Sequence, residues 1–300
     1  MSHIAEVMKM AKKVHTVLPA FNIPYIPMME PVVRALEEKN TFGLITVARL
    51  EWVKFESKSQ EDIASEYRRV GNPECTSLHL DHIPVIDEDH LRIDYMSDIS
   101  KALDAGYSSV MIDGSRLNLE ENIKAVREVV ELAHKTDVPV EAELGAVMGH
   151  ESDGIPDYDE LFESGKGFTD LKEAQRFVKE TGVDWLSVAV GSVHGAITAS
   201  ARKQKKVTAR LNIEHLQMLD EALQIPLVLH GGSGIALPYL KDSFNHGIAK
   251  LNIATDIRQP YEALKDTSIK QAQNAVYETM LEIINRLNLE GSAEKLLRRK

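Results

Sequence analysis

The sequence alternates, along almost its whole length, between short apolar runs and longer amphipathic stretches, and this alternation limits the possible folds more than any other feature. The apolar runs are rich in Val, Ile and Leu without strict alternation, which is typical of parallel strands covered on their outer side. We therefore expect eight strands, at residues 16–21, 43–48, 76–80, 108–112, 138–144, 185–190, 227–229 and 249–253.

Helical patterns fill the stretches between these runs, and we expect helices at residues 27–39, 60–70, 99–105, 119–135, 171–181, 213–223 and 238–245. A chain of 300 residues is long enough to bury a sizeable core. The alternation predicts an α/β fold, a (β/α)8 TIM barrel that forms one domain over residues 1–300 with a C-terminal helical extension at 268–287. A doubly wound open sheet is the runner-up.

Several boundaries carry the residues expected at helix ends. Gly106, Gly182 and Gly247 each follow a helical stretch and precede a strand, where a left-handed residue commonly ends a helix. Asn118 precedes a stretch with acids in its first turn, which predicts a helix N-cap.

Composition excludes some classes of protein. The formal net charge of -11 argues against a nucleic-acid partner, although a small anionic substrate needs only a local positive site. Cys75 is the only cysteine, so no intrachain disulfide can form. Residues 1–19 lack the apolar run of a signal peptide, and no window approaches the length of a membrane span. We expect a cytoplasmic protein without a membrane partner.

Two insertions interrupt the pattern. Residues 149–167, which combine Gly and Pro with many acids, predict a long mobile loop after the fifth strand. Residues 196–210 predict a basic loop after the sixth strand, with cations from Arg202 to Lys206. Long loops after strands are often functional. For the basic loop, a solvated surface is an equally good interpretation.

Polar side chains stand at nearly every expected strand end. In a barrel of this kind, the carboxyl ends of the strands supply the active-site residues. The residues at these ends are Asn22, Arg49, Asp81, His82, Asp113, Glu143, His194, His230 and Asn252. So many ionisable groups on one rim predict an active site there.

Three of these residues are histidines, namely His82, His194 and His230. Three imidazoles with an open fourth position make a catalytic zinc site. A single histidine is more often a satisfied core or surface residue, but the set of three favours a metal centre. His79 has the same strand parity as Asp81, so we expect it to point into the barrel, where it is a candidate for orienting a ligand.

The segment that follows His230 is glycine-rich, with Gly231, Gly232, Ser233 and Gly234 leading into a helical stretch. Glycines at a helix N-terminus let backbone N–H groups approach an anion, and such phosphate sites recur after the last strands of this fold. Alone, the motif more often marks a turn. Its place after a candidate metal ligand favours phosphate binding.

Together these motifs resemble a known family. The segments at residues 79–82 (HLDH), 109–115 (SVMIDGS), 141–145 (EAELG), 190–195 (VGSVHG), 227–234 (LVLHGGSG) and 250–256 (KLNIATD) are similar, in family order, to those of the class II, zinc-dependent ketose-bisphosphate aldolases. That family includes the fructose- and tagatose-bisphosphate enzymes. The resemblance runs from about residue 20 to residue 256.

The resemblance implies roles for the residues that match. It makes His82, His194 and His230 the zinc ligands, Asp81 the acid that exchanges a proton with the hydroxyl at the cleaved bond, and Glu151 the loop carboxylate that handles the proton at the enediolate carbon. Asp113 and Glu143 match a second or alternative cation position, divalent or monovalent. The cradle for the phosphate and the substrate matches Asn22, Gly195, Gly231, Ser233, Asn252, Ala254 and Thr255.

The resemblance also implies an activity. The chain is expected to be a lyase of carbohydrate metabolism, of the glycolytic fructose/tagatose-bisphosphate aldolase type, that yields dihydroxyacetone phosphate and an aldehyde and acts as a homodimer or homotetramer. A barrel that binds a sugar phosphate without turnover is one alternative. A TIM-barrel metal-dependent hydrolase is another, but such enzymes commonly carry His-x-His after the first strand, where this chain has Phe21, Asn22 and Ile23.

Some positions depart from the family pattern. Ile83 and Pro84 follow Asp81-His82 where relatives have Gly, and extra residues extend to Tyr95. Arg49, a fixed cation suited to an anionic substrate group, stands where relatives carry Ser. The Lys that usually follows the second zinc histidine and the Pro-Arg segment that holds a distal phosphate have no evident match. The aldehyde half of the substrate is therefore left open.

Overall fold

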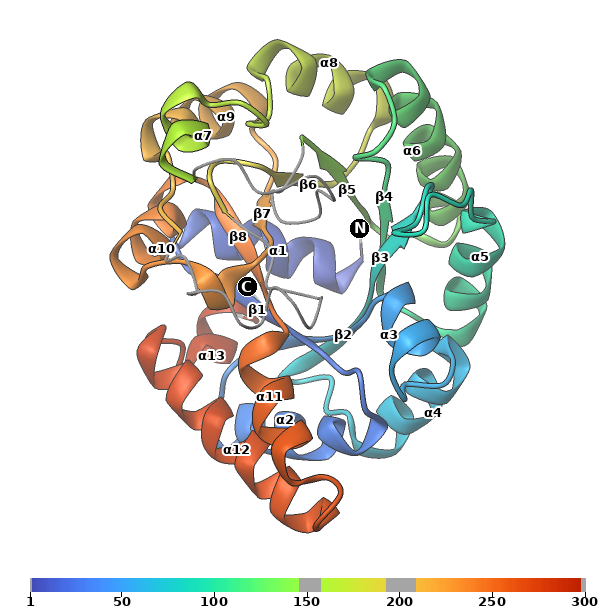
Figure 1. Cartoon of the computed structure of the whole chain (residues 1–300), viewed down its shortest axis with the longest axis vertical. Coiled ribbons are helices and arrows are strands. Elements are labelled where there is room, and N and C mark those ends of the chain that lie inside the picture. The colour runs from blue at the N-terminus through green and yellow to red at the C-terminus, as the bar shows by residue number, and fades with distance from the viewer. Residues whose placement is uncertain (1, 146–157, 193–208, 298–300) are drawn as a thin grey trace.

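Eight parallel strands close into a barrel in the order β1 to β8, and β8 pairs with β1. The computed structural model describes residues 2–145, 158–192 and 209–297, and in it helices surround the barrel (Figure 1). The predicted (β/α)8 architecture is confirmed. The strands are β1 (Leu18–Asn22), β2 (Gly43–Val47), β3 (Thr76–Pro84), β4 (Ser109–Asp113), β5 (Val140–Leu144), β6 (Trp185–Val188), β7 (Leu227–Leu229) and β8 (Ile248–Ile253).

Strand β3 differs most from its predicted range, because it continues past residue 80 to Pro84. Its register with β4 shifts between Leu80 and Ile83, and His82 has a φ of 84°. Such a bulge inserts a residue into one strand and redirects its side chains. The sequence pattern predicted a strand that stops before the bulge.

The seven predicted helices are all present, with ends shifted by a few residues. They are α2 (Met29–Glu38), α4 (Gln60–Val70), α5 (Tyr95–Ala105), α6 (Leu119–Ala133), α8 (Leu171–Thr181), α9 (Ile213–Leu223) and α10 (Leu237–Ser243). Gly106, Gly182 and Gly247 adopt positive φ as predicted, and Asn118 accepts a hydrogen bond from the backbone N–H of Glu121.

Additional helices are α1 (His3–Lys13), α3 (Arg49–Lys54), α7 (Tyr158–Ser164), α11 (Thr255–Leu264), α12 (Ile269–Arg286) and α13 (Ser292–Leu296). Helix α7 lies inside the stretch 149–167 that was predicted to be a loop, so that prediction was wrong for residues 158–164. Its aromatic residues explain the helix, because Tyr158 donates a hydrogen bond to the carbonyl of Gly191 and anchors this segment beside the barrel.

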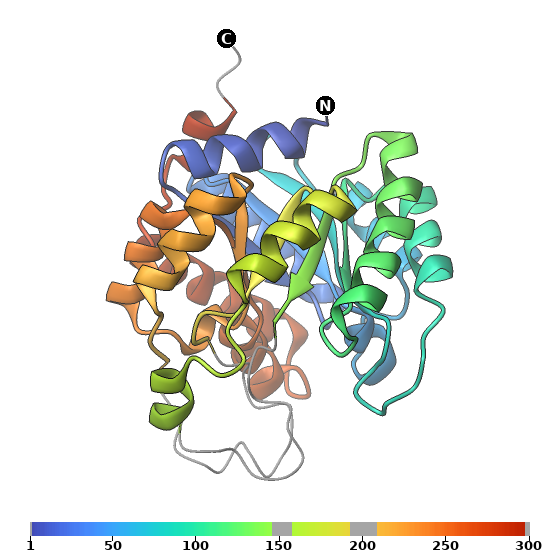
Figure 2. The ribbon, with the colours of Figure 1, turned by 90° about the horizontal axis from the view of Figure 1, so that it is seen from above.

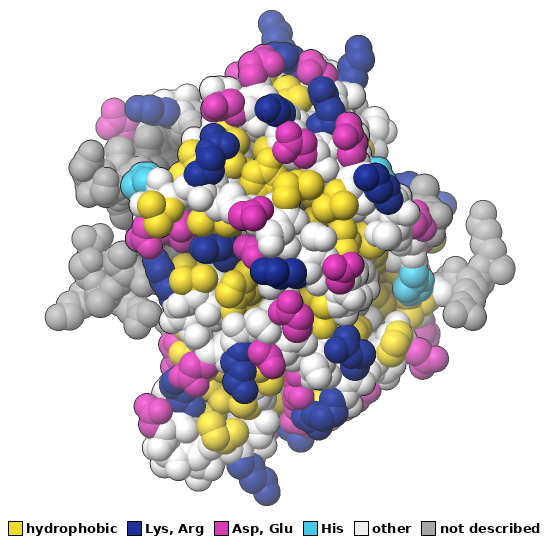
Figure 3. Space-filling view, turned by 90° about the vertical axis from the view of Figure 1, so that its right-hand side faces the viewer, with side chains coloured by type: hydrophobic (Ala, Val, Ile, Leu, Met, Phe, Trp, Pro, Cys, Tyr) yellow, Lys and Arg dark blue, Asp and Glu magenta, His cyan; other side chains and the backbone are white. Residues whose placement is uncertain are grey.

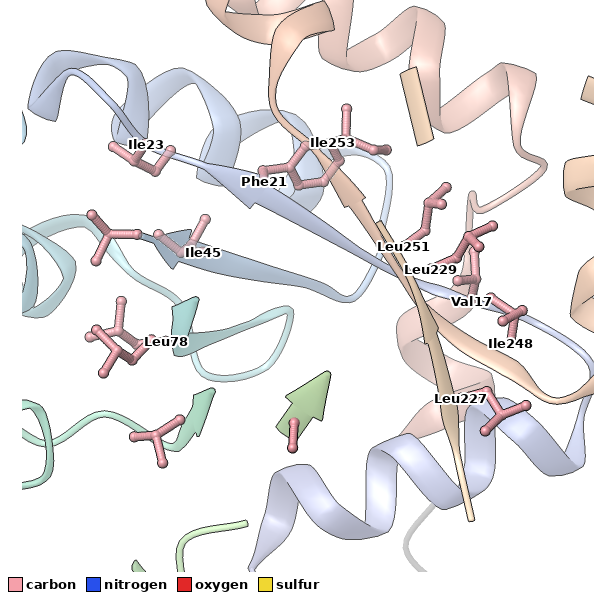
Figure 4. Packing of buried hydrophobic residues seen from close by; sticks show 14 of the residues in the cluster. Val17, Phe21, Ile23, Ile45, Leu78, Leu227, Leu229, Ile248, Leu251 and Ile253 are labelled. Carbon is pink, nitrogen blue, oxygen red and sulfur yellow. The ribbon is translucent and has the colours of Figure 1, made fainter. Parts of the chain in front are cut away.

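The outward faces of the strands are apolar and pack against the surrounding helices in one large core. Figure 4 shows part of this core, with Phe21, Ile45, Leu78, Leu229 and Ile253 projecting from different strands. This arrangement explains the near-continuous apolar runs in the sequence, because each strand meets helices on one side and the barrel interior on the other.

Helix α1 closes the amino-terminal end of the barrel and lies next to α13 (Figure 2). A second buried cluster joins α1 to the part of the barrel interior near the amino ends of the strands. It includes Ile4, Val7, Met8, Ala11, Leu18, Ala20, Leu44, Trp185, Val228 and Ala249. This end of the barrel is therefore filled by hydrocarbon.

The predicted C-terminal helical extension is confirmed. Helix α12 begins after Ser268, whose side chain accepts a hydrogen bond from the N–H of Gln271, and it packs against α11 and α2. Its buried residues Val276, Met280 and Ile283 belong to the same hydrophobic core as the outward faces of the strands. The apolar face of α12 is thus largely covered within the chain.

The outer side formed by α4, α5 and α6 carries acidic and basic side chains interspersed with apolar ones (Figure 3). This mixture is the polar face expected of amphipathic helices around a barrel. Within the described part of the chain, every helix is too short or too polar to cross a membrane.

Candidate metal centre at the carboxyl ends of the strands

The bulge in β3 brings two neighbouring residues to one place. Alternation along a regular strand would turn Asp81 and His82 to opposite faces. Because His82 takes a positive φ, its imidazole joins Asp81 and His230 in a group whose ligand atoms all lie within 4.8 Å of one another. The Asp81 side chain is 2% exposed, whereas the His82 side chain is 23% exposed.

The imidazoles of His82 and His230 face each other. The Nε2 of His82 lies 2.9 Å from the Nδ1 of His230. Two nitrogens on a tetrahedral zinc ion, each about 2.0–2.1 Å from the metal, lie about 3.3 Å apart. The separation found here is that of a hydrogen bond and is about 0.4 Å shorter, so a small separation of the two rings would give the spacing of a metal-ligand pair.

In each ring, the nitrogen that faces away from the other imidazole lies close to a carboxylate. The Nδ1 of His82 lies 3.3 Å from Asp113 Oδ2, and the Nε2 of His230 lies 3.0 Å from Glu141 Oε1. Metal-binding histidines usually donate their second N–H to such a carboxylate, which fixes the tautomer and orients the ring. Glu143 completes the group, with its Oε2 3.2 Å from His230 Nδ1. This donor set fits a divalent cation.

The charges around the two rings favour a cation. Burial acts to lower the pKa of His82, but the carboxylates of Asp81 and Asp113 raise it to about 10. Burial, followed by the charge of Asp113, raises the pKa of Glu143. A field that holds a proton so firmly on an imidazole also attracts a metal ion that competes with that proton.

A lysine, a glutamate and a histidine lie beneath this group, and our sequence analysis gave no role to the first two. Lys250 Nζ lies 2.8 Å and 3.0 Å from the two carboxylate oxygens of Glu141, and all of its side chain is buried. His79 points into the barrel as predicted, and its Nδ1 lies 2.8 Å from Ser109 Oγ. Burial, followed by the nearby Lys250 charge, lowers the pKa of His79 to about 3, so this imidazole is neutral.

The carboxylate of Asp81 is held by two amides. Asn22 Nδ2 donates to Oδ2 at 2.9 Å, and Asn252 Nδ2 donates to both oxygens at 2.9 Å and 3.0 Å. Burial acts to raise the pKa of Asp81, but the charges of Lys250 and His82 hold it far below its usual range. Asp81 is thus an ionised carboxylate in a fixed orientation. Asn22 and Asn252, predicted as substrate and phosphate contacts, hold this carboxylate in the structure.

Arg49 is engaged by other side chains of the chain. It is the first residue of α3, and its guanidinium lies 3.7 Å from Asp87 Oδ2 and 3.5 Å from Asp98 Oδ2. Asp87 anchors the excursion of residues 85–93 that follows β3, since its side chain also accepts hydrogen bonds from the N–H groups of Asp89 and Leu91. The expected fixed cation therefore lies in an internal ion pair.

The loops after β7 and β8 lie side by side. Gly231 adopts a φ of 75°, and a Cβ on Gly232 would meet the Leu251 side chain at 2.7 Å, so both positions favour glycine. Ser233 follows in a short 3₁₀ turn. Ala254 and Thr255 form the start of α11, where unpaired backbone N–H groups can meet an anion.

Three predicted site residues, His194, Gly195 and Glu151, lie outside the described residues. The third imidazole, one part of the cradle and the loop carboxylate therefore remain predictions from the sequence. The described part of the site contains Asp81, His82 and His230 together.

Comparison with known proteins gives consistent matches over nearly the whole chain. The model of the family described as "Fructose-bisphosphate aldolase class-II" matches residues 2–292. The chain is similar to the YdjI aldolase from Escherichia coli K12, with 29% sequence identity, a TM-score of 0.75, and 98% of this chain and 100% of that chain covered. It also shares its fold with the fructose-bisphosphate aldolase Fba from Campylobacter jejuni, at 18% identity, a TM-score of 0.72, and coverage of 97% and 96%.

Proposed function

Because the chain belongs to the class II fructose-bisphosphate aldolase family, we propose that it is a metal-dependent aldehyde-lyase acting on a ketose 1-phosphate or ketose 1,6-bisphosphate. It cleaves, and in reverse forms, the bond between C3 and C4, giving dihydroxyacetone phosphate and an aldehyde. The observation that carries this proposal is the pair of facing imidazoles, 2.9 Å apart, beside the ionised carboxylate of Asp81.

The residues proposed to hold Zn²⁺ are His82, His230 and His194. When bound, zinc supplies a Lewis acid that stabilises the negative charge left by cleavage of the C–C bond. Asp113 and Glu141 orient the two described rings through their outer nitrogens. Glu143 and Asp113 are proposed to form the second cation position, because His82, Asp113 and Glu143 also offer ligand atoms within 4.8 Å of one another.

Two protons must move during the reaction, at two different atoms, so two separate groups are required. Asp81 is proposed to take the proton of the C4 hydroxyl as the bond breaks, since it is ionised and its orientation is fixed by Asn22 and Asn252. Glu151 is proposed to handle the proton at the enediolate carbon, on the basis of the sequence resemblance.

The phosphate of the dihydroxyacetone phosphate half is assigned to the loops after β7 and β8. Gly231, Ser233, Ala254 and Thr255 stand there, the last two at the N-terminus of α11, and Gly195 is assigned to the same cradle. Asn252 is assigned to the substrate as well as to Asp81. We further propose a cytoplasmic enzyme that assembles as a homodimer or homotetramer.

The test is a retro-aldol assay of metal-replete protein on a panel of ketose 1-phosphates. Fructose 1,6-bisphosphate comes first, then tagatose 1,6-bisphosphate, then ketose 1-phosphates with an uncharged end. Turnover should disappear after treatment with EDTA and return when zinc is restored. Absence of turnover on the whole panel, or turnover that resists EDTA, contradicts the proposal. Binding of the same compounds without turnover would instead favour a sugar-phosphate-binding barrel.

A further inference from the structure

Lys250 is a buried cation for which the proposed reaction has no use. It lies on β8, two residues before Asn252, and its side chain is 0% exposed. Lysine is almost never fully buried unless its charge is paired. Burying such a pair stabilises a fold little or not at all compared with apolar residues of the same volume. Its presence inside the barrel therefore calls for another explanation than stability.

The contacts of Lys250 lead to a metal-ligand histidine through one carboxylate. Glu141 Oε1 is shared, since it lies 3.0 Å from Lys250 Nζ and 3.0 Å from His230 Nε2. Glu141 Oε2 lies 2.8 Å from the same ammonium group. A carboxylate that meets an ammonium with both oxygens cannot rotate freely, so one oxygen stays directed at the His230 ring.

We propose that Lys250 is a positioning residue. Its ammonium group holds the Glu141 carboxylate so that Oε1 accepts the Nε2 hydrogen of His230, which leaves the Nδ1 of that ring turned toward His82 as a metal ligand. The same ammonium lies 3.7 Å from Asp81 Oδ1, so one cation aligns the carboxylates on both sides of the metal group. This inference rests on the proposed metal centre.

The chain offers a matched control at the other end of the barrel. Lys12 on α1 is also paired, with its Nζ 2.5 Å from Asp220 Oδ1 and 2.9 Å from the carbonyl oxygen of Ile225. None of these described contacts of Lys12 includes a histidine. A general effect of removing a paired lysine would appear in both variants, whereas positioning of His230 would be lost only with Lys250.

The main test compares Lys250→Met with Lys12→Met, without substrate. Zinc affinity is measured by competition with a chromophoric chelator, and the proton-bearing nitrogen of His230 by long-range ¹H–¹⁵N spectra of the zinc-free protein. We expect zinc affinity to fall about 10- to 100-fold in Lys250→Met, together with loss of the preference for an Nε2 proton, and to stay unchanged in Lys12→Met. Wild-type affinity and an unchanged His230 tautomer in Lys250→Met would overturn the inference.

A second pair of variants keeps the test valid if Lys250→Met does not fold. In Glu141→Gln, one amide oxygen must serve both the ammonium and the imidazole, so zinc affinity should fall. In Lys250→Met/Glu141→Gln that oxygen is free for His230 and the buried Lys250–Glu141 ion pair is removed as a unit, so affinity should exceed that of Glu141→Gln. Failure of the double variant to recover affinity contradicts the inference. Because none of these measurements needs turnover, an inactive wild-type protein refutes only the proposed function.

Discussion

The barrel interior contains two adjoining layers that are equally buried but chemically opposite. At the amino end, Leu18, Leu44 and Val228 pack against α1. Next to this layer, toward the carboxyl end, the same barrel encloses His79, Asp81, Glu141 and Lys250, each exposed by 1% or less. We call the apolar set, with its immediate neighbours, the lower layer, and the charged set, with its immediate neighbours, the upper layer. Strand β1 passes from one to the other, since Leu18 and Ala20 precede Asn22 at alternate positions.

The difference separates stability from chemistry. Apolar area removed from water stabilises a fold by about 25 cal/mol for each Å². Buried ionic groups give no comparable gain, because the desolvation of each charge offsets most of the attraction between them. Substitutions in the lower layer should therefore reduce the free energy of unfolding, and substitutions in the upper layer should mainly reduce turnover or metal binding.

The largest expected effect is on turnover, from Asp81→Ala in the upper layer. Removal of a positioned general base or acid typically lowers a rate about 10²- to 10⁴-fold. We expect kcat for retro-aldol cleavage to fall within that range while zinc remains bound, since the facing nitrogens belong to His82 and His230. Steady-state kinetics and metal analysis of the purified variant provide the check.

Thermal unfolding of the same variant sharpens the comparison. In Asp81→Ala, Lys250 keeps its shorter contact, which is with Glu141 at 2.8 Å, and loses only the contact with Asp81 at 3.7 Å. We therefore expect a small change in melting temperature beside a large fall in kcat. A variant with wild-type turnover would show that the upper layer has no part in the chemistry.

The next effect, on stability, comes from Leu44→Ala in the lower layer. Leu44 is completely buried on β2, and such truncations usually reduce the free energy of unfolding by about 2 to 5 kcal/mol. We expect kcat of the folded protein to stay within a factor of about two, because the cavity forms at the end of the barrel away from Asp81. Denaturant titration and kinetics on the same sample separate the two quantities. Loss of turnover with unchanged stability would break the division into layers.

The barrel and most of the rim could be predicted from the sequence because both follow from local patterns. Apolar runs define strands, and the polar residues at their ends, such as Asp113 and Glu143, lie on one rim in any closed parallel barrel. The bulge at His82 was not predictable, because a positive φ at histidine has no local sequence signal that distinguishes it from a regular strand.

The upper layer was missed for a different reason. Glu141 on β5 and Lys250 on β8 are separated by 109 residues, and only closure of the barrel brings their side chains together across its interior. A signal was present, because Glu141 and Glu143 alternate within an apolar run, as do Lys250 and Asn252. Charges at alternate positions of a covered strand indicate a polar barrel interior. Non-local pairing also explains why the sequence did not predict the ion pairs of Arg49. Its partner Asp87 lies in the excursion after β3, and Asp98 lies in α5.

An effect on stability of similar size is expected from Glu51, a buried carboxyl at the start of α3 beside the upper layer. Its Oε2 accepts the N–H of Ala48 at 2.8 Å, and burial raises its pKa to about 8 from an ordinary value of 4.5. Between these two values the unfolded chain binds fewer protons than the folded protein. The contribution of Glu51 to the free energy of unfolding should therefore fall as pH rises from 4.5 to about 8, by at most about 1.4 kcal/mol for each pH unit, and stay constant above that range.

Glu51→Gln removes the titrating group and should remove this slope. Urea titrations of both proteins across the pH range measure the difference, and Glu74→Gln, at an exposed position, serves as the control. Equal slopes in the wild-type protein and Glu51→Gln over this range would show that Glu51 is ionised in the folded state.

The smallest effect is expected from Arg49→Met, at the edge of the upper layer. Arg49 is partly exposed and paired with Asp87 and Asp98 at 3.5–3.7 Å, and such ion pairs stabilise a protein by about 1 kcal/mol or less. If the internal pairing is its main role, KM for bisphosphate and monophosphate ketoses should change by less than about twofold. Asp98→Asn provides the opposite perturbation, because it releases one side of the guanidinium. If Arg49 instead binds a distal anionic group of the substrate, Arg49→Met should raise KM for the bisphosphate alone. Asp98→Asn should then lower KM for the bisphosphate. The two variants therefore decide, by the sign of their effects on KM, whether this arginine belongs to the scaffold or to the upper layer's chemistry.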